Sequence, residues 1–509
     1  MFFKLPSAAA VGLDCQPVEV EIDINRGQSN FSVVGLPDAS IQEARARIYS
    51  AIKNSDFAFP FNFRVLINLA PADLRKEGPL YDLPMAVGVI AASQELPLKL
   101  ADALIVGELA LDGSVRHVNG ILPLAIFAKN HGLKRLFLPA ADAAEAAMAT
   151  GTEIYPVKNL RQIIAHLNGE AQIAPYGGEE KSAIEKEESD SNEEIDLAIV
   201  KGQEFAKRAL EIAAAGGHNL LMNGPPGSGK TLLARALPSI LPALTTDEAI
   251  EVTKIYSIAG LLPRGGLVRV RPFRSPHHTI SNIALVGGGQ TPRPGEISLA
   301  HRGVLFLDEF PEFSRAALES MRQPLEDGMV TISRAQGTLS FPARFVLVAS
   351  QNPCPCGFAT DPERPCICAP HQLVVYRKKI SGPLLDRIDL HAEVPRVKYE
   401  KLASDELAEP SEKIRQRVEA AREIQRTRFR GRQIITNNEM RNAEIRDCCR
   451  LDSAAADLLR TAATKTRLSA RGYHRVLKVA RTIADLSNSD NIKLEHIAEA
   501  LQYRIKEEV

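Results

Sequence analysis

Residues 224–231 are Gly224-Pro225-Pro226-Gly227-Ser228-Gly229-Lys230-Thr231, and they lie between an apolar run that ends at Met222 and a helix-like run at 232–237. Glycines at this spacing let backbone N–H groups wrap phosphates at a helix N-terminus, while the lysine reaches the β and γ positions. The stretch therefore predicts a strand, a loop that binds a nucleoside triphosphate and a helix, with Thr231 as a Mg2+ ligand. The alternative is a glycine-rich turn that opens an ordinary helix, and the strand-loop-helix setting disfavours it.

The whole chain has the composition of a globular protein with about two to four domains. Its 509 residues include 62 Lys and Arg and 62 Asp and Glu. This balance excludes a global basic excess, so any nucleic-acid site must be a local patch. We find neither an N-terminal signal pattern nor a run of 18 apolar residues. Seven cysteines, four of them clustered, suit a reducing compartment, and we expect a cytoplasmic protein.

An acidic segment of low apolar content divides the chain. In the first part, 18–24 alternates and 65–69 is apolar, and both patterns favour strands. The last part is rich in Ala, Leu, Glu and Arg at helical spacing. We expect a mixed α/β chain with a first domain at 1–168, a flexible linker at 169–194, an ATPase core at 195–395 and a helical lid at 396–509.

A second motif, at 303–309, is a buried strand followed by two acids, Asp308 and Glu309. In ATPases with this type of loop, the aspartate supports Mg2+ and the next carboxylate polarises the attacking water. A strand that ends in Asp-Glu is common, but its position after the phosphate loop makes it informative. We expect Asp308 and Glu309 in these roles.

Two further candidates follow the strand-like run at 344–350. Asn352 could orient the hydrolytic water from the neighbouring strand, or it could simply form an Asn-Pro turn. Arg387 stands among acids and apolar residues. It is either a surface ion-pair residue or an arginine finger that reaches the γ-phosphate of a neighbouring subunit.

Together these motifs resemble the AAA+ ATPases of the magnesium-chelatase and MCM-helicase branch. The stretches 271–279 and 294–301 are similar to the bacterial magnesium-chelatase-like family of YifB and the competence protein ComM, and the likeness covers nearly the full chain. The resemblance implies an AAA+ core with a C-terminal helical lid and the cofactors ATP and Mg2+. For members of the ComM type it also implies a homohexameric ring motor that drives branch migration of DNA during recombination.

The resemblance also assigns two arginines. Arg387 matches the family's arginine finger, supplied across a subunit interface. Arg471 matches the sensor arginine of the lid, which implies that it serves the chain's own ATP. Both would act on phosphate charge. Arg475 and Arg481 follow on the same helical segment, so an ordinary surface arginine remains the alternative for Arg471.

Two segments are candidates for DNA contact. Residues 330–339 favour two short strands about a turn. In MCM-like helicases the matching hairpin carries a lysine into the channel, and Arg334 stands at that position; a solvated hairpin tip is the alternative. The segment 262–271 alternates arginine with apolar residues and resembles a family insertion within the second helix. It contributes Arg264, Arg269 and Arg271, the last two on one face of an expected strand. Such contacts would give weak sequence specificity and strong salt dependence.

Four cysteines form two CxC pairs separated by nine residues: Cys354, Cys356, Cys366 and Cys368. They could close around a structural Zn2+, with reduced loop thiols as the alternative. Their position just after Asn352 predicts that they brace this loop and take no direct part in catalysis.

The first domain resembles the Lon protease domain in residues 68–79 and 106–115. In that family a serine and a lysine act as nucleophile and base. The matching positions here are Leu80 and Leu122, so we expect no peptidase activity. The domain would shape the ring or contact DNA.

These observations favour an ATP-driven ring motor on branched or duplex DNA. A chelatase motor that inserts metal into a porphyrin is the rival enzyme, and a nucleotide-gated recombination scaffold is the non-enzymatic rival. Glu309 disfavours the scaffold, because a scaffold would not need an acid that activates water.

Overall fold

The computed structural model describes residues 1–149, 151–177, 195–262, 266–289, 292–334, 337–361, 363–397, 408–465 and 468–504. It forms two compact units, each with its own apolar core. The first comprises Met1–Ser191 and Ala249–Val268, and the second comprises Asn192–Glu248 and Arg269–Val509. Most of the expected linker, from residue 178 onward, lies outside the described residues.

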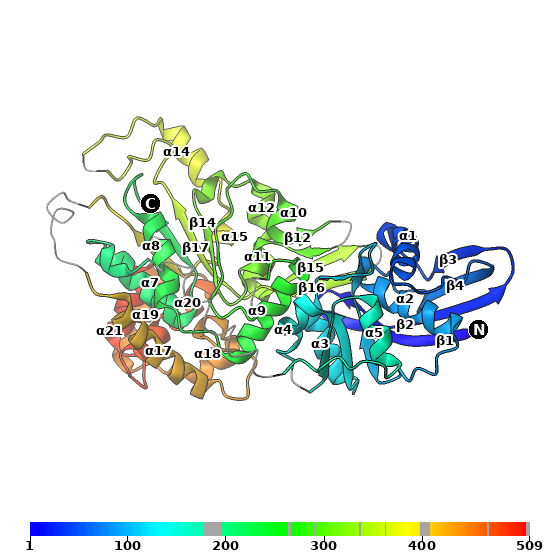
Figure 1. Cartoon of the computed structure of the whole chain (residues 1–509). Coiled ribbons are helices and arrows are strands. Elements are labelled where there is room, and N and C mark those ends of the chain that lie inside the picture. Colours follow the sequence, from blue (N-terminus) through cyan, green and yellow to red (C-terminus); the bar gives the residue numbers. More distant parts are fainter. Residues whose placement is uncertain are drawn as a thin grey trace. The chain divides into compact units, whose positions relative to one another are not determined.

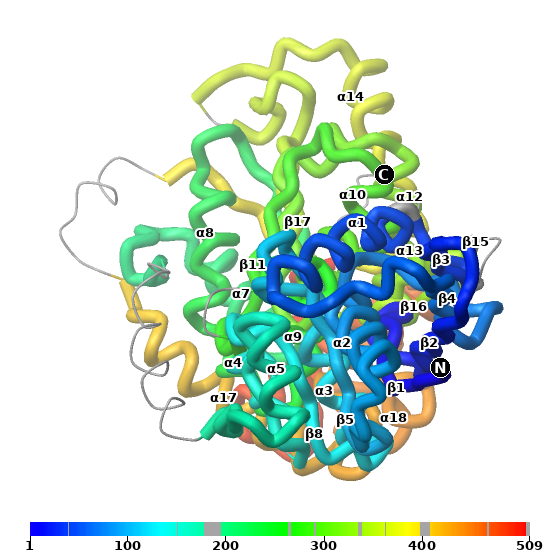
Figure 2. Tube along the Cα trace, turned by 45° about the vertical axis from the view of Figure 1, so that its right-hand side comes forward, coloured from blue at the N-terminus to red at the C-terminus, as the bar shows by residue number. Residues whose placement is uncertain are grey.

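A four-stranded sheet dominates the first unit. Its strands are β1 (Phe2–Val11), β2 (Asp14–Arg26), β3 (Asn30–Val34) and β4 (Phe63–Ala70), in the order β1-β2-β4-β3. Only the β3–β4 pair is parallel. Along β2, alternate residues from Val18 to Ile24 are buried, as the sequence predicts. Helices α1 (Ala39–Asn54) and α2 (Asp82–Ser93) pack on this sheet and on each other (Figure 2).

A smaller parallel sheet completes this unit. It contains β5 (Ala103–Ile105), β8 (Arg135–Pro139) and β9 (Glu153–Val157) in the order β5-β8-β9. A hairpin of β6 (Glu108–Leu109) and β7 (Val115–Arg116) follows β5. The accompanying helices are α3 (Ile121–Asn130), α4 (Ala143–Ala146) and α5 (Leu160–Leu167).

Residues 249–268 belong to the first unit although they interrupt the second. They include most of α9 (Thr246–Ala259). The Ser257 hydroxyl donates to Glu145 Oε1 at 2.6 Å, and Glu145 also accepts from the Leu122 amide at 2.7 Å. A Cβ atom at Gly266 would lie 2.3 Å from the terminal methyl of Met148. These contacts explain why the segment packs with the first unit, whereas the sequence alone placed it in the ATPase core.

The second unit is built on a five-stranded parallel sheet (Figure 1). Its order is β11-β14-β17-β10-β18, and the strands are β11 (Phe273–Arg274), β14 (Val304–Leu307), β17 (Val346–Gln351), β10 (Leu220–Asn223) and β18 (Leu390–Glu393). The residues of β14 are all buried, as expected for a central parallel strand. The helices of this part are α7 (Glu204–Gly216), α8 (Lys230–Ala236), α10 (Asn282–Val286), α11 (Glu296–Leu299), α12 (Arg315–Ser320), α13 (Arg322–Asp327), α14 (Pro370–Arg377) and α15 (Gly382–Leu385).

Two hairpins accompany the sheet. The first pairs β12 (Gly287–Gly288) with β13 (Arg293–Pro294), and the second pairs β15 (Met329–Arg334) with β16 (Gly337–Pro342). The second confirms the hairpin that the sequence predicts at 330–339.

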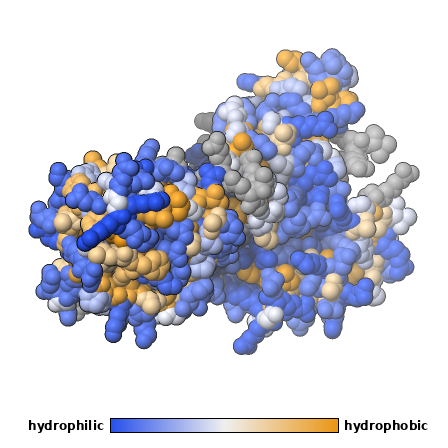
Figure 3. Space-filling view, turned by 90° about the vertical axis from the view of Figure 1, so that its right-hand side faces the viewer, coloured by the Kyte–Doolittle hydropathy of each residue, from blue (hydrophilic) through white to orange (hydrophobic). Residues whose placement is uncertain are grey.

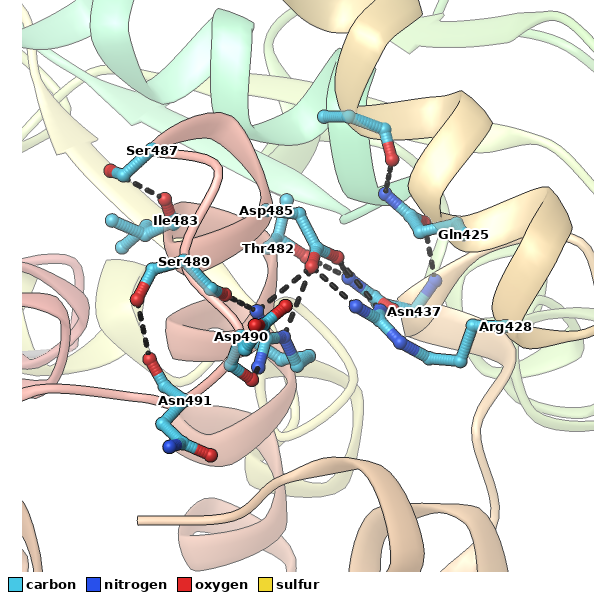
Figure 4. A network of polar contacts seen from close by, with 12 residues as sticks. Gln425, Arg428, Asn437, Thr482, Ile483, Asp485, Ser487, Ser489, Asp490 and Asn491 are labelled. Carbon is cyan, nitrogen blue, oxygen red and sulfur yellow. Dashed lines mark hydrogen bonds and ion pairs between the residues drawn. The ribbon is translucent and has the colours of Figure 1, made fainter. Parts of the chain in front are cut away.

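The chain ends in a helical region made of α17 (Ser411–Arg428), α18 (Asn442–Cys448), α19 (Ser453–Lys465), α20 (Ala470–Leu486) and α21 (Leu494–Gln502). A buried polar network joins α17 and α20 (Figure 4). Asp485 accepts from Arg428 at 2.5 Å and from the Asn437 amide at 2.8 Å. His218, from the ATPase core, bonds the Thr482 hydroxyl at 2.8 Å and so ties the helical region to the sheet. The observed architecture is thus the expected α/β core with a C-terminal helical domain.

Large apolar side chains are exposed at scattered positions, among them Phe2 (65%), Leu36 (56%) and Phe61 (54%). Figure 3 shows apolar and polar residues interspersed over one face. Among the described residues, we find no helix with the length and apolar character needed to span a bilayer.

Candidate nucleotide-binding site

The loop between β10 and α8 needs glycine for two different reasons. Gly227 and Gly229 have φ angles of +77° and +92°, a region that side chains other than glycine rarely adopt. At Gly224 the reason is steric, because a Cβ atom there would lie 2.1 Å from the carbonyl oxygen of Val394. The loop therefore passes directly against the residue that follows β18.

Lys230 begins α8, and its ammonium group points back into the loop. Nζ donates to the carbonyl oxygens of Gly224 at 2.7 Å and Pro225 at 2.9 Å. It also donates to Asn352 Oδ1 at 3.3 Å. Burial lowers the pKa of Lys230, and the nearby Asp308 opposes that shift. A phosphate would give this partly desolvated cation a charged acceptor, which is stronger than a neutral carbonyl.

Asp308 follows β14 and faces the loop. Its Oδ2 accepts from the Thr231 hydroxyl at 2.9 Å, and its Oδ1 accepts from the Glu309 amide at 3.0 Å and from the Ser350 hydroxyl. A hydroxyl and a carboxylate are hard oxygen donors of the kind that Mg2+ prefers. The residues present therefore fit a magnesium ion held between Thr231 and Asp308.

Glu309 adopts a left-handed backbone with φ of +52°, and its side chain is 55% exposed. Its Oε2 lies 3.4 Å from Nδ1 of His278. An exposed carboxylate next to the magnesium candidates has room to contact water. His278 is a neighbour that the sequence motifs did not indicate.

Asn352 follows β17, which lies between β14, the strand before Asp308, and β10, the strand before the phosphate loop. The Asn352 backbone is hydrogen-bonded to the phenol of Tyr376, and burial raises the pKa of Tyr376 to about 12. Three adjacent parallel strands thus bring Lys230, Asp308 and Asn352 to one edge of the sheet. This is the edge where ligands bind in open α/β sheets.

Arg387 and Arg471 meet each other at Glu326 rather than at Lys230. Arg387 Nη2 forms an ion pair with Glu326 Oε2, and Arg471 Nη2 lies 3.3 Å from Glu326 Oε1. Arg387 is only 11% exposed, whereas Arg471 is 57% exposed. Both line a cavity of about 390 Å³ together with His474, Arg475 and Lys478. The family resemblance assigns Arg471 to the chain's own nucleotide. In the structure Arg471 contacts Glu326, the same carboxylate that pairs with Arg387.

Buried charges fix the backbone around Arg387. The Asn219 amide side chain donates to the Arg387 carbonyl at 3.0 Å, and the Asn219 backbone donates to Asp389 at 3.1 Å. Burial by itself would raise the pKa of Asp389, but a hydrogen bond and the charge of His218, together with Arg475, lower it to about 2. The ionised carboxylate of Asp389 and the side chain of Asn219 therefore hold the turn that contains Arg387 in place.

The DNA candidates fare differently. Arg264 lies outside the described residues, and Arg334 ends β15, paired with Gly337, with its side chain also outside the description. Arg269 is exposed. The segment 269–271 is not a strand, since β11 begins at Phe273.

The structure contradicts the prediction that Arg271 contacts DNA. Its guanidinium is 12% exposed and donates to the carbonyl oxygens of Pro242 and Arg302, while pairing with Glu248 at 3.0 Å. These internal acceptors occupy the group, so Arg271 has a structural role and does not offer its charge to a DNA backbone.

In the first unit, Leu122 is fully buried in α3 and Leu80 is half-buried in the short 3-10 helix Pro79–Tyr81. Their side chains offer neither a nucleophile nor a base. The prediction that this unit lacks peptidase chemistry remains in place.

Comparisons with known proteins address the whole chain. Residues 196–402 match the family model of magnesium chelatase, subunit ChlI. Residues 20–142 match subunit ChlI of Mg-chelatase, and residues 408–504 match its C-terminal part.

Three relatives define the neighbourhood. The competence protein ComM of Haemophilus influenzae is 43% identical over 502 residues, which cover 98% of this chain and 96% of the relative. YifB of Escherichia coli is 43% identical over 503 residues, covering 97% and 96% respectively. The magnesium-chelatase 38 kDa subunit of Rhodobacter capsulatus is 28% identical over 174 residues, covering 31% of this chain and 50% of that subunit. The chain belongs to the magnesium-chelatase-like AAA+ ATPase family that includes ComM and YifB.

Proposed function

We propose that this chain is an ATP-driven motor that works on DNA as a homohexameric ring, with branch migration during recombination and natural transformation as its activity. The observation that carries the proposal is the division of the candidate residues into two groups. Lys230, Asp308 and Asn352 gather at one edge of the sheet, whereas Arg387 and Arg471 meet at Glu326. Two half-sites on one chain call for a second copy to complete each of them.

In this proposal each chain binds the triphosphate with its own loop. Lys230 neutralises the β- and γ-phosphates, while Thr231 and Asp308 hold Mg2+, which screens the phosphate charge. Glu309 accepts a proton from the attacking water, and Asn352 orients that water. These groups prepare hydrolysis.

Arg387 and Arg471 then come from the neighbouring chain. Planar guanidinium groups match phosphate oxygens and stabilise the charge that develops on the transferred phosphoryl group. To act in this way, both must exchange the Glu326 carboxylate for the neighbour's phosphate. The pairing with Glu326 keeps the two arginines together until the interface forms.

The DNA part of the proposal rests on other support. The relative from Haemophilus influenzae is a competence protein and shares nearly the full length of this chain. Strand β15 of the β15–β16 hairpin ends at Arg334, and Arg269 is exposed on the segment before β11. Arg334 and Arg269 would contact phosphates without reading bases.

A second candidate is a motor for metal insertion into a porphyrin, as in magnesium chelatase. The match to the Rhodobacter capsulatus chelatase subunit favours it. That match covers 31% of this chain, while the competence relative covers 98% of it. The competence relative therefore shares more of this chain than the chelatase subunit does, which favours the DNA motor.

The test is branch migration of synthetic four-way junctions with ATP. The wild-type chain should process junctions. Lys230→Ala should neither bind ATP nor process junctions. Arg334→Ala should still hydrolyse ATP, but DNA should stimulate its hydrolysis less. Arg460→Ala is the control, because Arg460 is a surface arginine with a side chain that is 78% exposed. DNA-stimulated hydrolysis without junction processing would refute the motor, and hydrolysis indifferent to DNA would favour the chelatase candidate.

A further inference from the structure

We propose that Cys354, Cys356, Cys366 and Cys368 bind a structural Zn2+, and that the loop closed by this metal holds the phosphate loop and Asn352 in position. Nucleotide affinity then depends on the metal. The inference rests on the proposed ATP site for its second half only, because the metal site itself is independent of DNA and of movement.

The four sulfurs already have the spacing of a metal-bound set. All four lie within 4.8 Å of one another. The Sγ of Cys356 is 3.3 Å from that of Cys354 and 3.6 Å from that of Cys366, and the Cys366 and Cys354 sulfurs are 3.7 Å apart. Zn–S bonds of about 2.3 Å in a tetrahedron place neighbouring sulfurs about 3.8 Å apart. Disulfides would need about 2.05 Å.

The chemistry of the donors favours zinc. The set contains thiols alone, and four soft ligands in a tetrahedron are typical of closed structural zinc sites. The Cys356 amide donates to Cys368 Sγ at 3.4 Å, which is the kind of hydrogen bond that stabilises a metal-bound sulfur. A closed set of four ligands leaves no position for substrate, so the role is structural.

The loop is irregular and partly exposed. Between the end of β17 at Gln351 and the start of α14 at Pro370, the described residues form neither a helix nor a strand. Cys354 is buried, but Ile367, between the last two cysteines, is 85% exposed. A metal cross-link between the two CxC pairs supplies the order that an apolar core does not supply here.

Gly357 carries the first contact with the nucleotide site. It has φ of +87° and follows Cys356 directly. A Cβ atom at this position would lie 2.7 Å from Cδ and 3.2 Å from Cγ of Pro226, a residue of the phosphate loop. The cysteine loop thus rests on the phosphate loop so closely that only glycine fits between them.

Two more contacts bind the same unit together. The Asn352 backbone is hydrogen-bonded to Tyr376 on α14, so both ends of the cysteine loop meet beside Asn352. Arg396 forms an ion pair with Glu363 of the cysteine loop at 2.9 Å. Arg396 lies two residues after Val394, and Val394 packs against Gly224 of the phosphate loop. Releasing the metal would loosen three supports of the phosphate loop and Asn352 at once.

The first experiment measures metal and nucleotide binding on the full chain. We expect about one zinc per chain by elemental analysis of freshly reduced protein. Removal of zinc with a chelator should raise the Kd for a fluorescent ATP analogue, measured with Mg2+ present, by about tenfold, and added Zn2+ should restore it. Less than about half an equivalent of zinc, or iron in its place, would overturn the zinc assignment.

Two variants separate the metal from the contact it maintains. Cys356→Ser should lose zinc and weaken nucleotide binding, whereas Cys448→Ser, which alters a cysteine outside the cluster, should do neither. Gly357→Ala keeps every cysteine and should retain zinc, yet weaken nucleotide binding by about tenfold, because its Cβ displaces Pro226. Chelation of the intact wild-type chain keeps the test valid if either variant folds poorly.

The outcomes distinguish this inference from the proposed function. If the purified chain holds one zinc but removal of that zinc leaves the Kd for the ATP analogue unchanged, the proposed dependence of nucleotide affinity on zinc is overturned and the ATP site stands. A wild-type, zinc-loaded chain that binds no ATP would instead refute the proposed function.

Discussion

Replacing Gly224 by alanine tests the steric account of the phosphate loop. The added Cβ would lie 2.1 Å from the Val394 carbonyl oxygen. Carbon–oxygen contacts settle at about 3.3 Å or more, so one of the two segments must move by about 1 Å. Val394 cannot yield easily, because its amide donates to Asn223 at 2.7 Å at the end of β10. The displacement therefore falls on Gly224 and Pro225, whose carbonyls hold Lys230.

The expected magnitude follows from that displacement. A misplacement of about 1 Å at a reacting centre costs about a hundredfold in rate, or about 2.7 kcal/mol of transition-state stabilisation. Overpacking should also lower the free energy of unfolding by about 1–3 kcal/mol. The assay is steady-state ATP hydrolysis by the full chain, with thermal unfolding followed in parallel.

Gly227→Ala is the matched control in the same loop. A Cβ there meets no atom within 4 Å, but the φ of +77° makes the substitution strained. The strain costs about 1–2 kcal/mol of stability without forcing the loop aside, so activity should fall less than about tenfold. The steric reasoning would be refuted if Gly224→Ala kept activity within about threefold of wild type, or if Gly227→Ala were the more damaging change.

The remaining predictions concern the interface, the surface arginines and acid stability. Arg387→Ala and Arg471→Ala should each lower the rate of ATP hydrolysis by about a thousandfold or more. Each variant should regain activity when it is mixed with an equal amount of Lys230→Ala. In such a mixture about a quarter of the randomly formed interfaces hold an intact lysine facing an intact arginine. Failure of Arg471→Ala to be rescued would return that arginine to its own chain's nucleotide. Arg271→Ala should cost about 3–5 kcal/mol in thermal unfolding, because Glu248 loses its buried partner, whereas Arg269→Ala should keep stability and lower the salt slope of DNA binding by about one; equal effects on stability would contradict the different environments of the two. Burial lowers the pKa of His391 to about 3, so an unfolded chain binds a proton near pH 6.5 that the folded chain refuses. Stability should therefore fall as pH drops from 6.5 towards 3, by at most about 1.4 kcal/mol per pH unit, and His391→Gln should flatten a denaturant titration over this range; an unchanged slope would refute the assignment.

Local patterns predicted the parts of this molecule that depend on neighbours in the sequence. The glycine spacing at 224–231 predicted the loop between a strand and a helix, and the pattern of two short strands about a turn at 330–339 predicted the β15–β16 hairpin. The approach of Asp308 and Asn352 to Lys230 was predictable too, because parallel strands end at one edge of a sheet.

Contacts between residues that are distant in the sequence could not be predicted in this way. Arg387 and Arg471 meet at Glu326, which is 61 and 145 residues away from them, and no motif marks that glutamate. The interior role of Arg271 depends on carbonyl oxygens of Pro242 and Arg302, and backbone acceptors leave no trace in side-chain patterns. Alternating arginines thus indicated a charged surface where the fold turned one of them inward.

The interruption of the second unit by residues 249–268 bears on how this molecule can be cut apart. The chain passes between the units three times, near residues 191, 248 and 268. A protease that nicks the acidic linker would leave the large C-terminal fragment still holding part of the first unit, clasped through Ser257 and Glu145. The two fragments should migrate together until denatured. A truncation that begins at the linker would remove Glu145 and Met148, which contact Ser257 and Gly266, and should therefore yield an ATPase of lower stability than the full chain.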